Sequence, residues 1–350
     1  DASFLKNHAY KLMKGASEFW IDSLVQSRDN ETFLISSPSH SPEHGPFTEG
    51  AAVDQQLVWQ LFNTTLEAAS IAGERDKKFL QELTDAYGRL SSGLKIGVWG
   101  QLQEWLLDLD DPNENHHHLA PFYAIYPGRQ AFSIESGGDQ ESILNAARVA
   151  LQRRGDGSTG DDGATIKGWP KTWRAALWAR LEHGEEAVEA LEAFKRKNIN
   201  HSNLLTNEEL SGQFGYGAAI LELLVQDRRS NEIRVWTTPQ TGLPKWWVSA
   251  GNLGGYRTRD GHAVAVQWKN SRVETVEVMT SNSGNVGKSG PLVVVVGTLG
   301  GGEGEEGATP TEKIKVQIKD SGKAVLFERR GNELSWVVSK SLTYLVLVEA

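Results

Sequence analysis

Cysteine is absent from the 350 residues, so the chain can form no disulfide and offers no thiolate for catalysis or metal binding. Long apolar runs are missing too, because no stretch approaches the ~20 residues that a membrane-spanning helix needs. The chain also lacks an excess of basic residues, since its net charge is −9, which argues against a nucleic-acid surface. We therefore expect neither a membrane nor a nucleic acid as a partner.

Tryptophan, by contrast, is plentiful, with twelve residues in the chain. Most of these rings fit the core of a helical protein. Two or three of them could instead line a sugar cleft, where flat rings stack on the apolar faces of pyranoses.

Three tripeptides have the N-glycosylation acceptor pattern, beginning at Asn30, Asn63 and Asn200. Such tripeptides also arise by chance, so they favour a secreted or extracellular location only weakly. The chain starts at Asp1 without an initiator Met, and we therefore expect a processed product or an excerpt.

The first 227 residues carry the apolar spacing of helices. Eight segments show this spacing: 4–25, 54–73, 75–90, 100–109, 139–155, 170–184, 185–198 and 216–227. Asp54 is expected to be the N-cap of the second of these helices. The spacing predicts a helical domain over 1–227.

From residue 228 the apolar period changes to two, over short segments bounded by Gly, Asn and Asp. This pattern predicts a C-terminal β-sandwich domain over 228–350. Within it, the segment 297–307 is too rich in Gly and Glu to pack and is interpreted as a loop.

The stretch "SSPSHSPEHG", residues 36–45, cannot be a helix interior, because proline lacks a backbone donor and restricts the residue before it. It presents one carboxylate, Glu43, between Pro42 and His44. A carboxylate on such a rigid loop has the limited freedom that a general acid needs, although an incidental surface glutamate would look the same.

A second polar cluster spans residues 100–128 and contains Gln103, Glu104 and three consecutive histidines, 116–118. If that run is extended, His116 and His118 share one face. A zinc site would need a further ligand at proper spacing, and the segment offers none, so we expect no metal. Hydrogen bonding of His and Gln to sugar hydroxyls is the favoured interpretation.

Two further motifs lie later in the helical half. In "KGWPKTW", Trp169 precedes a proline at the first helical position, which places its ring on the entry loop of a helix. "LSGQFGYG", residues 210–217, is interpreted as a Gly-rich loop that carries Gln213 before a helix. It lacks the Lys-Ser/Thr ending of a phosphate loop.

Taken in order, these motifs resemble glycoside hydrolase family 95. The order is an "SPS.SPE" elbow, "GQLQEW", a His-rich stretch leading to "YPG", "GW…W…LWARL", a "G.FG" segment and a β module. The resemblance implies a mainly α, then β, fold: part of an (α/α)6 barrel, beginning after the start of that barrel, and a small β domain.

The resemblance also implies an inverting hydrolase that removes terminal α-1,2-linked L-fucose from an oligosaccharide or polysaccharide. Glu43 matches the general acid of the family. The expected substrate contacts are His44, Gln103, Glu104, His116, His118, Trp169, Trp173 and Gln213. No cofactor and no metal is implied, because protonation and attack by water need only side chains.

Some positions depart from the family pattern. His44 and Gln213 each stand where the family has asparagine, and Ser211 stands where it has the aspartate that helps two asparagines to activate water. That asparagine pair has no counterpart in this sequence. Serine supplies no charge, and losing a base costs about 10²–10⁴-fold in rate. The alternatives are a catalytically weak or inactive carbohydrate-binding homologue, an α-L-galactosidase, or a helical scaffold without a ligand.

Overall fold

The computed structural model describes residues 2–134, 138–155, 168–199, 210–235, 247, 249–270, 272–280, 292–296, 313–330, 333–336 and 342–349. The chain divides into two compact units, Asp1–Ile166 and Lys167–Ala350. Among the described residues, no helix is both long and apolar enough to cross a membrane. The predicted loop 297–307 lies outside the described residues.

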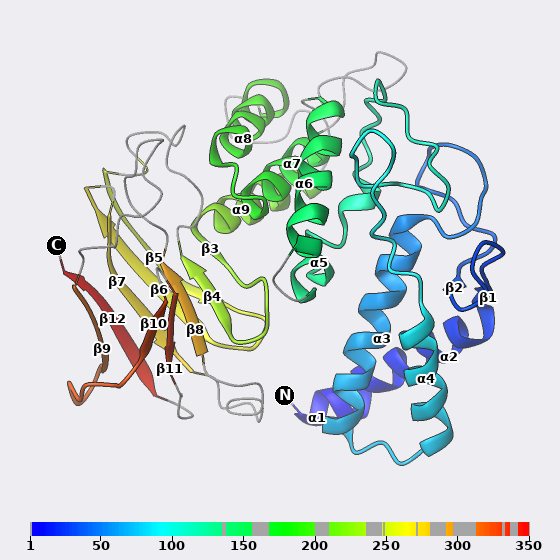
Figure 1. Cartoon of the computed structure of the whole chain (residues 1–350). Coiled ribbons are helices and arrows are strands. Elements are labelled where there is room, and N and C mark those ends of the chain that lie inside the picture. The colour runs from blue at the N-terminus through cyan, green and yellow to red at the C-terminus, as the bar shows by residue number, and fades with distance from the viewer. Residues whose placement is uncertain are drawn as a thin grey trace. The chain divides into compact units, whose positions relative to one another are not determined.

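Unit 1 consists of helices joined by long loops (Figure 1). Its elements are α1 (Ala2–Phe4), the π-helical η1 (Leu5–Ala9), α2 (Tyr10–Ser23), β1 (Val25–Gln26), β2 (Leu34–Ile35), α3 (Ala52–Ala72), α4 (Lys77–Arg89), the 3-10 turn η2 (Ala120–Phe122), α5 (Gln130–Ser133) and α6 (Gly138–Arg153). The two short strands pair with each other in antiparallel fashion.

Helices α2, α3 and α4 pack around a shared apolar core whose centre holds Phe62 and Leu83, both fully buried. The turn between α3 and α4 follows from local chemistry. Gly73 adopts a left-handed conformation (φ 74°) that ends α3, and the Asp76 side chain accepts a hydrogen bond from the Phe79 N–H (3.1 Å) to begin α4. The apolar spacing of the sequence therefore predicted these helices correctly.

The helix predicted over 100–109 is absent from the structure, which has irregular backbone there. The N–H groups that would start such a helix bond elsewhere. Those of Leu102 and Gln103 donate to the carbonyls of Ala146 (3.0 Å) and Lys95 (2.9 Å). Because tertiary partners satisfy this backbone, the local helical spacing is overridden.

Unit 2 begins with three helices, α7 (Gly168–Arg180), α8 (Gly184–Asn198) and α9 (Leu210–Leu224), and α7 packs against both of the others. The Gly-rich loop predicted over 210–217 is wrong, because these residues form the first two turns of α9. Its glycines serve packing: a Cβ on Gly215 would lie 2.3 Å from the Thr172 hydroxyl, and one on Gly212 2.9 Å from the Phe194 ring. Gln213 is therefore a helical residue.

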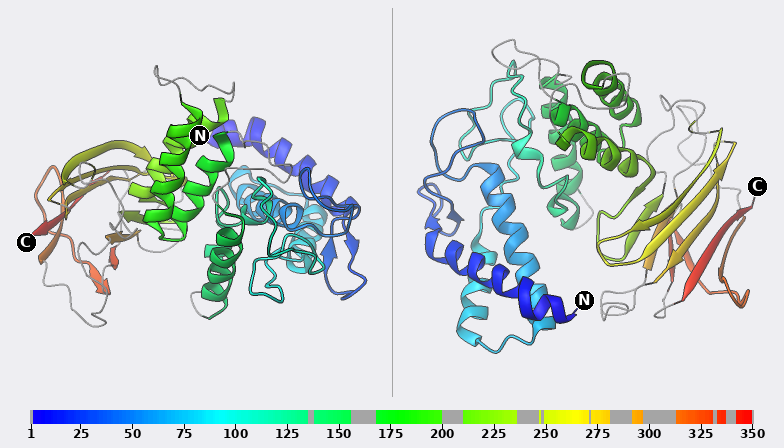
Figure 2. Two further views of the ribbon diagram at one scale, coloured as in Figure 1. Left: turned by 90° about the horizontal axis from the view of Figure 1, so that it is seen from above. Right: turned by 180° about the vertical axis from the view of Figure 1, so that it is seen from behind.

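The remainder of unit 2 is a sandwich of two five-stranded sheets (Figures 1 and 2). The first sheet has the order β10 (Glu328–Arg330), β11 (Glu333–Trp336), β8 (Leu292–Val296), β4 (Glu232–Val235), β3 (Val225–Gln226). The second has the order β5 (Ala250–Arg257), β6 (Ala263–Lys269), β7 (Arg272–Met279), β12 (Thr343–Glu349), β9 (Lys313–Ile318). Neighbouring strands are antiparallel, except for the parallel pair of β4 and β8.

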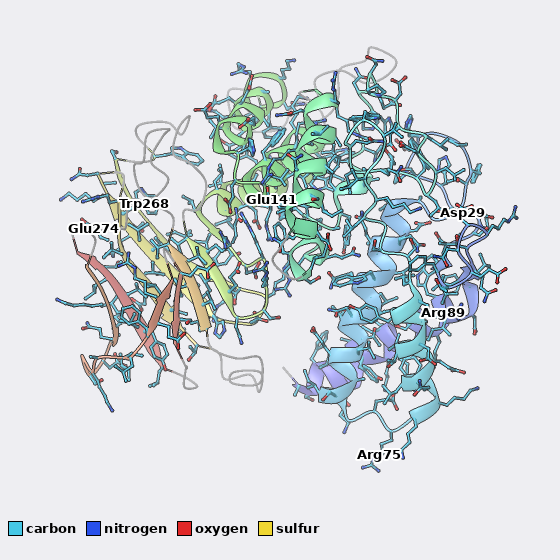
Figure 3. All side chains as sticks on the ribbon, viewed as in Figure 1. Asp29, Arg75, Arg89, Glu141, Trp268 and Glu274 are labelled. Carbon is cyan, nitrogen blue, oxygen red and sulfur yellow. The ribbon has the colours of Figure 1, made fainter. Side chains whose placement is uncertain are left out.

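One apolar core joins the two sheets, with Ile233 and Val294 from the first and Val276 and Val346 from the second, all fully buried. In the second half of β7, the buried Val276 and Val278 alternate with less buried residues, and Glu274, which is labelled with Trp268 of β6 in Figure 3, is exposed. This alternation is what a half-buried strand requires, and the predicted β-sandwich is confirmed.

The expected class of fold, mainly α and then β, is thus confirmed. The change from helices to strands falls at Leu224–Val225, close to the predicted boundary of 227/228. The division into two compact units falls elsewhere in the sequence, between residues 166 and 167, so α7, α8 and α9 belong to the same unit as the sandwich. The division into domains at 227/228 stays a prediction.

Candidate active site

The first loop, residues 36–51, connects β2 to α3 and is fixed by its short hydroxyl side chains. The Ser39 hydroxyl donates to Asp54 (2.6 Å) and accepts from the Ala51 N–H (2.9 Å). The Ser36 N–H donates to Gln55 in α3 (2.9 Å). Asp54 is therefore not the N-cap that the sequence predicted: α3 begins at residue 52, and this carboxylate anchors the loop instead.

The second loop, residues 91–119, connects α4 to η2 and places Glu104 at the centre of a buried polar network. The Glu104 carbonyl accepts from the Ala52 N–H at the start of α3 (2.9 Å). Its carboxylate accepts hydrogen bonds from Ser41 and from Arg154, which follows α6. Glu104 and Arg154 are almost completely buried, so this ion pair joins both loops to α6 away from water.

Arg154 also donates to the carbonyl of His118 (2.9 Å), and the histidine run lies against the first loop. His116 Nε2 donates to the Pro42 carbonyl (3.2 Å). The His116 ring stacks on His44 at 4.5 Å and on His118 at 5.1 Å. These contacts hold the two loops together on either side of the carboxylate that the sequence singled out.

That carboxylate, Glu43, is unusual in its backbone and in its surroundings. Its φ of 56° lies in the left-handed region, which non-glycine residues seldom adopt. The side chain is 74% exposed, and its Oε2 lies 3.0 Å from His118 Nε2 and 3.8 Å from His117 Nε2. The hydrogen bond from His118 and the charge of that ring lower the pKa of Glu43 below its usual value.

The neighbouring Gly45 (φ 71°) lets the first loop approach the indole of Trp105. A Cβ there would lie 2.4 Å from Trp105 Cζ2, so this position needs glycine for space as well as for conformation. On the other side, His44 Nε2 lies 2.8 Å from a Glu114 carboxylate oxygen. The residues that flank Glu43 are thus each fixed by the second loop.

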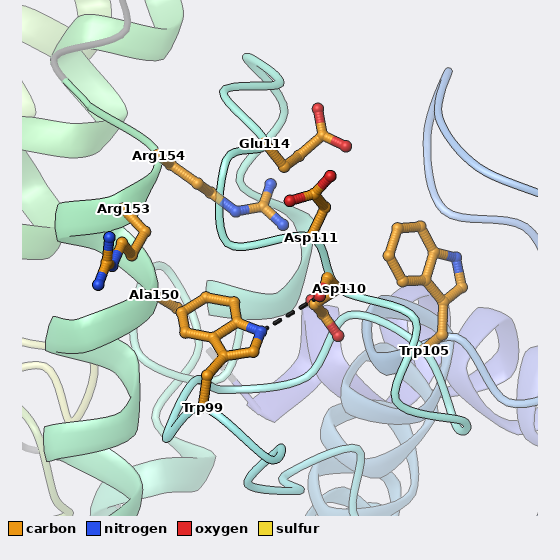
Figure 4. A pocket seen from close by; sticks show the side chains of 8 residues that line it. All are labelled: Trp99, Trp105, Asp110, Asp111, Glu114, Ala150, Arg153 and Arg154. Carbon is orange, nitrogen blue, oxygen red and sulfur yellow. Dashed lines mark hydrogen bonds between the residues drawn. The ribbon is translucent and has the colours of Figure 1, made fainter.

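A small cavity opens beside this network. Its lining consists of Trp99, Trp105, Asp110, Asp111, Glu114, Ala150, Arg153 and Arg154. In the view of Figure 4 the two indoles lie on opposite sides of Asp110, whose carbonyl accepts from Trp99 Nε1 (3.2 Å). The Asp110 carboxylate accepts from the Glu104 N–H (3.1 Å), and burial raises its pKa to about 6.

The structure brings together four of the predicted site residues: Glu43, His44, His116 and His118. Trp169, Trp173 and Gln213 belong to unit 2. The two indoles lie 6.0 Å apart at the start of α7, and neither they nor Gln213 are placed relative to Glu43. Their part in one site stays a prediction.

Gln103 and Glu104 belong to the second loop, but their side chains are buried. Because Ser41 and Arg154 occupy its carboxylate, Glu104 positions the loops, and its burial gives no support to the sugar contact that we predicted. The sugar contact predicted for Gln103 likewise stays without support from its position.

Sequence reasoning missed Arg154, Asp110 and Glu114. Arg154 looks like an ordinary helix-ending base, and the two acids lie in a run of polar loop residues where no periodicity marks one above another. His117 was also missed, since an extended run places only His116 and His118 on one face. A bend at this residue instead places its ring 4.5 Å from that of His118.

Comparisons with known proteins agree with these motifs. Residues 1–224 match the model of the glycosyl hydrolase family 95 catalytic domain. A "Probable alpha-fucosidase A" of Aspergillus niger is 33% identical over 289 residues, which is 78% of this chain and 36% of the relative. An "Alpha-L-fucosidase 2" of Arabidopsis thaliana is 28% identical over 290 residues, covering 77% of this chain and 32% of the relative.

A solved structure titled "Putative kojibiose phosphorylase from human microbiome" gives a TM-score of 0.49 at 11% identity, covering 85% of this chain and 45% of that one. The chain spans about a third of the length of the curated relatives that it matches. The family model covers well over half of the chain and includes both loops, the histidine run and α7 to α9. The chain therefore belongs to glycoside hydrolase family 95.

Proposed function

We propose that this chain contributes the general acid of a glycoside hydrolase that removes terminal α-1,2-linked L-fucose from glycans with inversion. The observation that carries the proposal is the conformation of Glu43. A left-handed backbone costs roughly 1–2 kcal/mol for a non-glycine residue, and backbone strain of this kind gathers at functional sites. An exposed glutamate brings no packing in return, so the strain points to a role for the carboxylate.

In the proposed step, Glu43 gives its proton to the glycosidic oxygen while the bond from that oxygen to the anomeric carbon breaks. Water attacks the carbon from the opposite face and loses a proton to a base that lies ~6.5–9.5 Å from the acid. Free Glu43 is held ionised by His118. A sugar that covers the Glu43 carboxylate removes water from it, which raises the pKa of Glu43 toward the value that a general acid needs.

His44 supports the proposal as a contact, because its partly exposed ring follows Glu43 in the chain and carries nitrogen atoms that could bond sugar hydroxyls. The buried ring of His116 stacks on it and holds it in place. The names of the relatives supply the sugar: those proteins are called α-fucosidases. We extend that substrate class to this chain, together with the secreted location that the acceptor tripeptides favour. Asn30 is exposed in a turn, whereas Asn63 lies inside α3 and accepts from Tyr87 (3.2 Å).

A second candidate is a catalytically weak or inactive carbohydrate-binding homologue. Ser211 favours it, because this residue replaces the aspartate implied by the family pattern and lies exposed on α9, where it supplies no charge for activating water. An α-L-galactosidase would share every feature of the site and differs only in the sugar that it accepts.

The test compares the chain with its Glu43→Gln variant on a fucosyl-α-1,2-galactoside and on the matching L-galactoside. We expect fucose release that falls by about 10²–10⁴-fold in the variant, with the inverted anomer formed first, as read by proton NMR. Glu49→Gln is the matched control, since Glu49 is another carboxylate of the first loop, and it should keep the wild-type rate.

Equal rates for wild type and Glu43→Gln would remove Glu43 from the role of acid. Sugar binding by calorimetry without turnover in either protein would favour the carbohydrate-binding candidate. If the chain neither binds nor hydrolyses the sugar, the result would favour a scaffold without a ligand.

A further inference from the structure

Three potential metal ligands meet where the two loops touch. The side chains of Glu43, His117 and His118 offer one carboxylate oxygen and two imidazole nitrogens, all within 4.8 Å of one another. The histidine run by itself lacks a third ligand, which is why the sequence predicted no metal. The structure supplies the missing ligand from the first loop, far away along the chain.

The spacing of these atoms fits a small transition cation. Ligands at ~2.0–2.2 Å from a tetrahedral zinc ion lie about 3.3 Å from one another. The carboxylate oxygen of Glu43 lies 3.0 Å from His118 Nε2 and 3.8 Å from His117 Nε2, one on each side of that value. Small side-chain rotations would therefore be enough to seat the ion.

The three ligands are also held in place by contacts that a metal would not disturb. The hydrogen bond from His116 to Pro42 fastens the histidine run to the residue that precedes Glu43. Arg154 donates to the His118 carbonyl, and the His116 ring stacks on that of His118. Preorganised ligands lose less conformational entropy on binding, so a surface location does not prevent affinity.

We propose that Glu43, His117 and His118 form a binding site for a divalent transition cation, with zinc as the best match to two imidazoles and one carboxylate. The fourth position would hold water. A carboxylate that ligates zinc has no proton to give, so the ion would act as a reversible inhibitor. That consequence depends on the proposed function, whereas binding of the ion does not.

The experiment uses the untagged chain, because a histidine tag would supply competing ligands. After treatment with a chelator, the chain is titrated with Co²⁺, and the visible absorption of the bound ion is followed at about pH 7, where imidazoles are neutral enough to ligate. We expect saturation at one ion per chain and loss of the absorption when Zn²⁺ is added.

His117→Ala and His118→Ala should each weaken binding by at least about tenfold, which is the smallest loss expected when a metal site is altered. Glu43→Gln should weaken binding by a similar factor. Because it removes no imidazole ring, it still tests the site if an alanine variant fails to fold. His8→Ala is the matched control, because it removes an exposed imidazole elsewhere in unit 1. Its binding should equal that of the wild type.

Absence of Co²⁺ absorption in the wild type, or equal weakening by His8→Ala and His117→Ala, would overturn the proposal. Co²⁺ binding without fucose release would keep the site and remove the proposed function. Fucose release that is insensitive to Zn²⁺, in a chain that binds no Co²⁺, would remove the metal site and keep the proposed function.

Discussion

The two loops of unit 1 and the sandwich of unit 2 reach a fixed structure by different means. In the sandwich, alternating valines fill one shared core, and any residue of similar shape would serve most of those positions. In the loops, individual side chains satisfy named backbone and side-chain groups, as Ser39 does for Ala51 and Arg154 does for His118. The apolar pattern therefore specifies the sandwich, whereas pairwise polar contacts specify the loops.

The largest expected effect comes from breaking the pair of Glu104 and Arg154. Arg154→Leu leaves a buried carboxylate without its partner, which we expect to destabilise unit 1 by about 3–5 kcal/mol. Urea unfolding followed by tryptophan fluorescence measures the loss. The double variant Glu104→Gln with Arg154→Leu removes the charge as well and should recover a large part of it.

The matched change in the sandwich is Leu292→Ile, at a fully buried position of β8. A swap that conserves volume should cost less than about 1.5 kcal/mol. A loss as large as that of Arg154→Leu would show that the sandwich also depends on individual residues, and the contrast between the two regions would fail.

A smaller effect concerns the pH dependence of unit 1. Burial raises the pKa of Asp110 from 3.8 to about 6, so the folded chain holds this proton more tightly than the unfolded chain. The contribution of Asp110 to the free energy of unfolding is greatest below about pH 4 and decreases as the pH rises through about 6. Because the side chain is partly exposed, we expect a loss of roughly 1–2 kcal/mol rather than the full value of the shift.

Asp110→Asn should abolish this decrease, as measured by urea unfolding at a series of pH values. An unchanged slope in the variant would mean that another group titrates in this range.

The smallest effect tests the backbone of Glu43. Glu43→Gly relieves the left-handed conformation, and we expect the melting temperature to rise by roughly 1–3 °C while fucose release is lost. Calorimetry and the activity assay together measure the two changes. A fall in melting temperature would mean that the contact with His118 outweighs the strain.

Prediction from the sequence succeeded where periodicity carries the information. The spacing of apolar residues predicted α2, α3, α4 and most strands of the sandwich. It failed at residues 100–109, because their backbone bonds to tertiary partners. It also failed at 210–217, because Gly215 makes room for Thr172 of α7 and Gly212 for Phe194 of α8 rather than for a turn. Glycine alone does not distinguish these two uses.

For the candidate site, the family motifs identified Glu43, His44, His116 and His118, and the structure places them together. Arg154 and Asp110 could not be found in this way. The burial that makes their charges matter comes from segments distant in sequence, and no local pattern records it.

Arg154 donates to the Glu104 carboxylate from one terminal nitrogen of its guanidinium and to the His118 carbonyl from the second terminal nitrogen. Because both hydrogen bonds come from one side chain, a displacement of the end of α6 would change the positions of Glu104 and His118 together. The distance between His118 and Glu43 therefore depends on a residue that lies in neither loop.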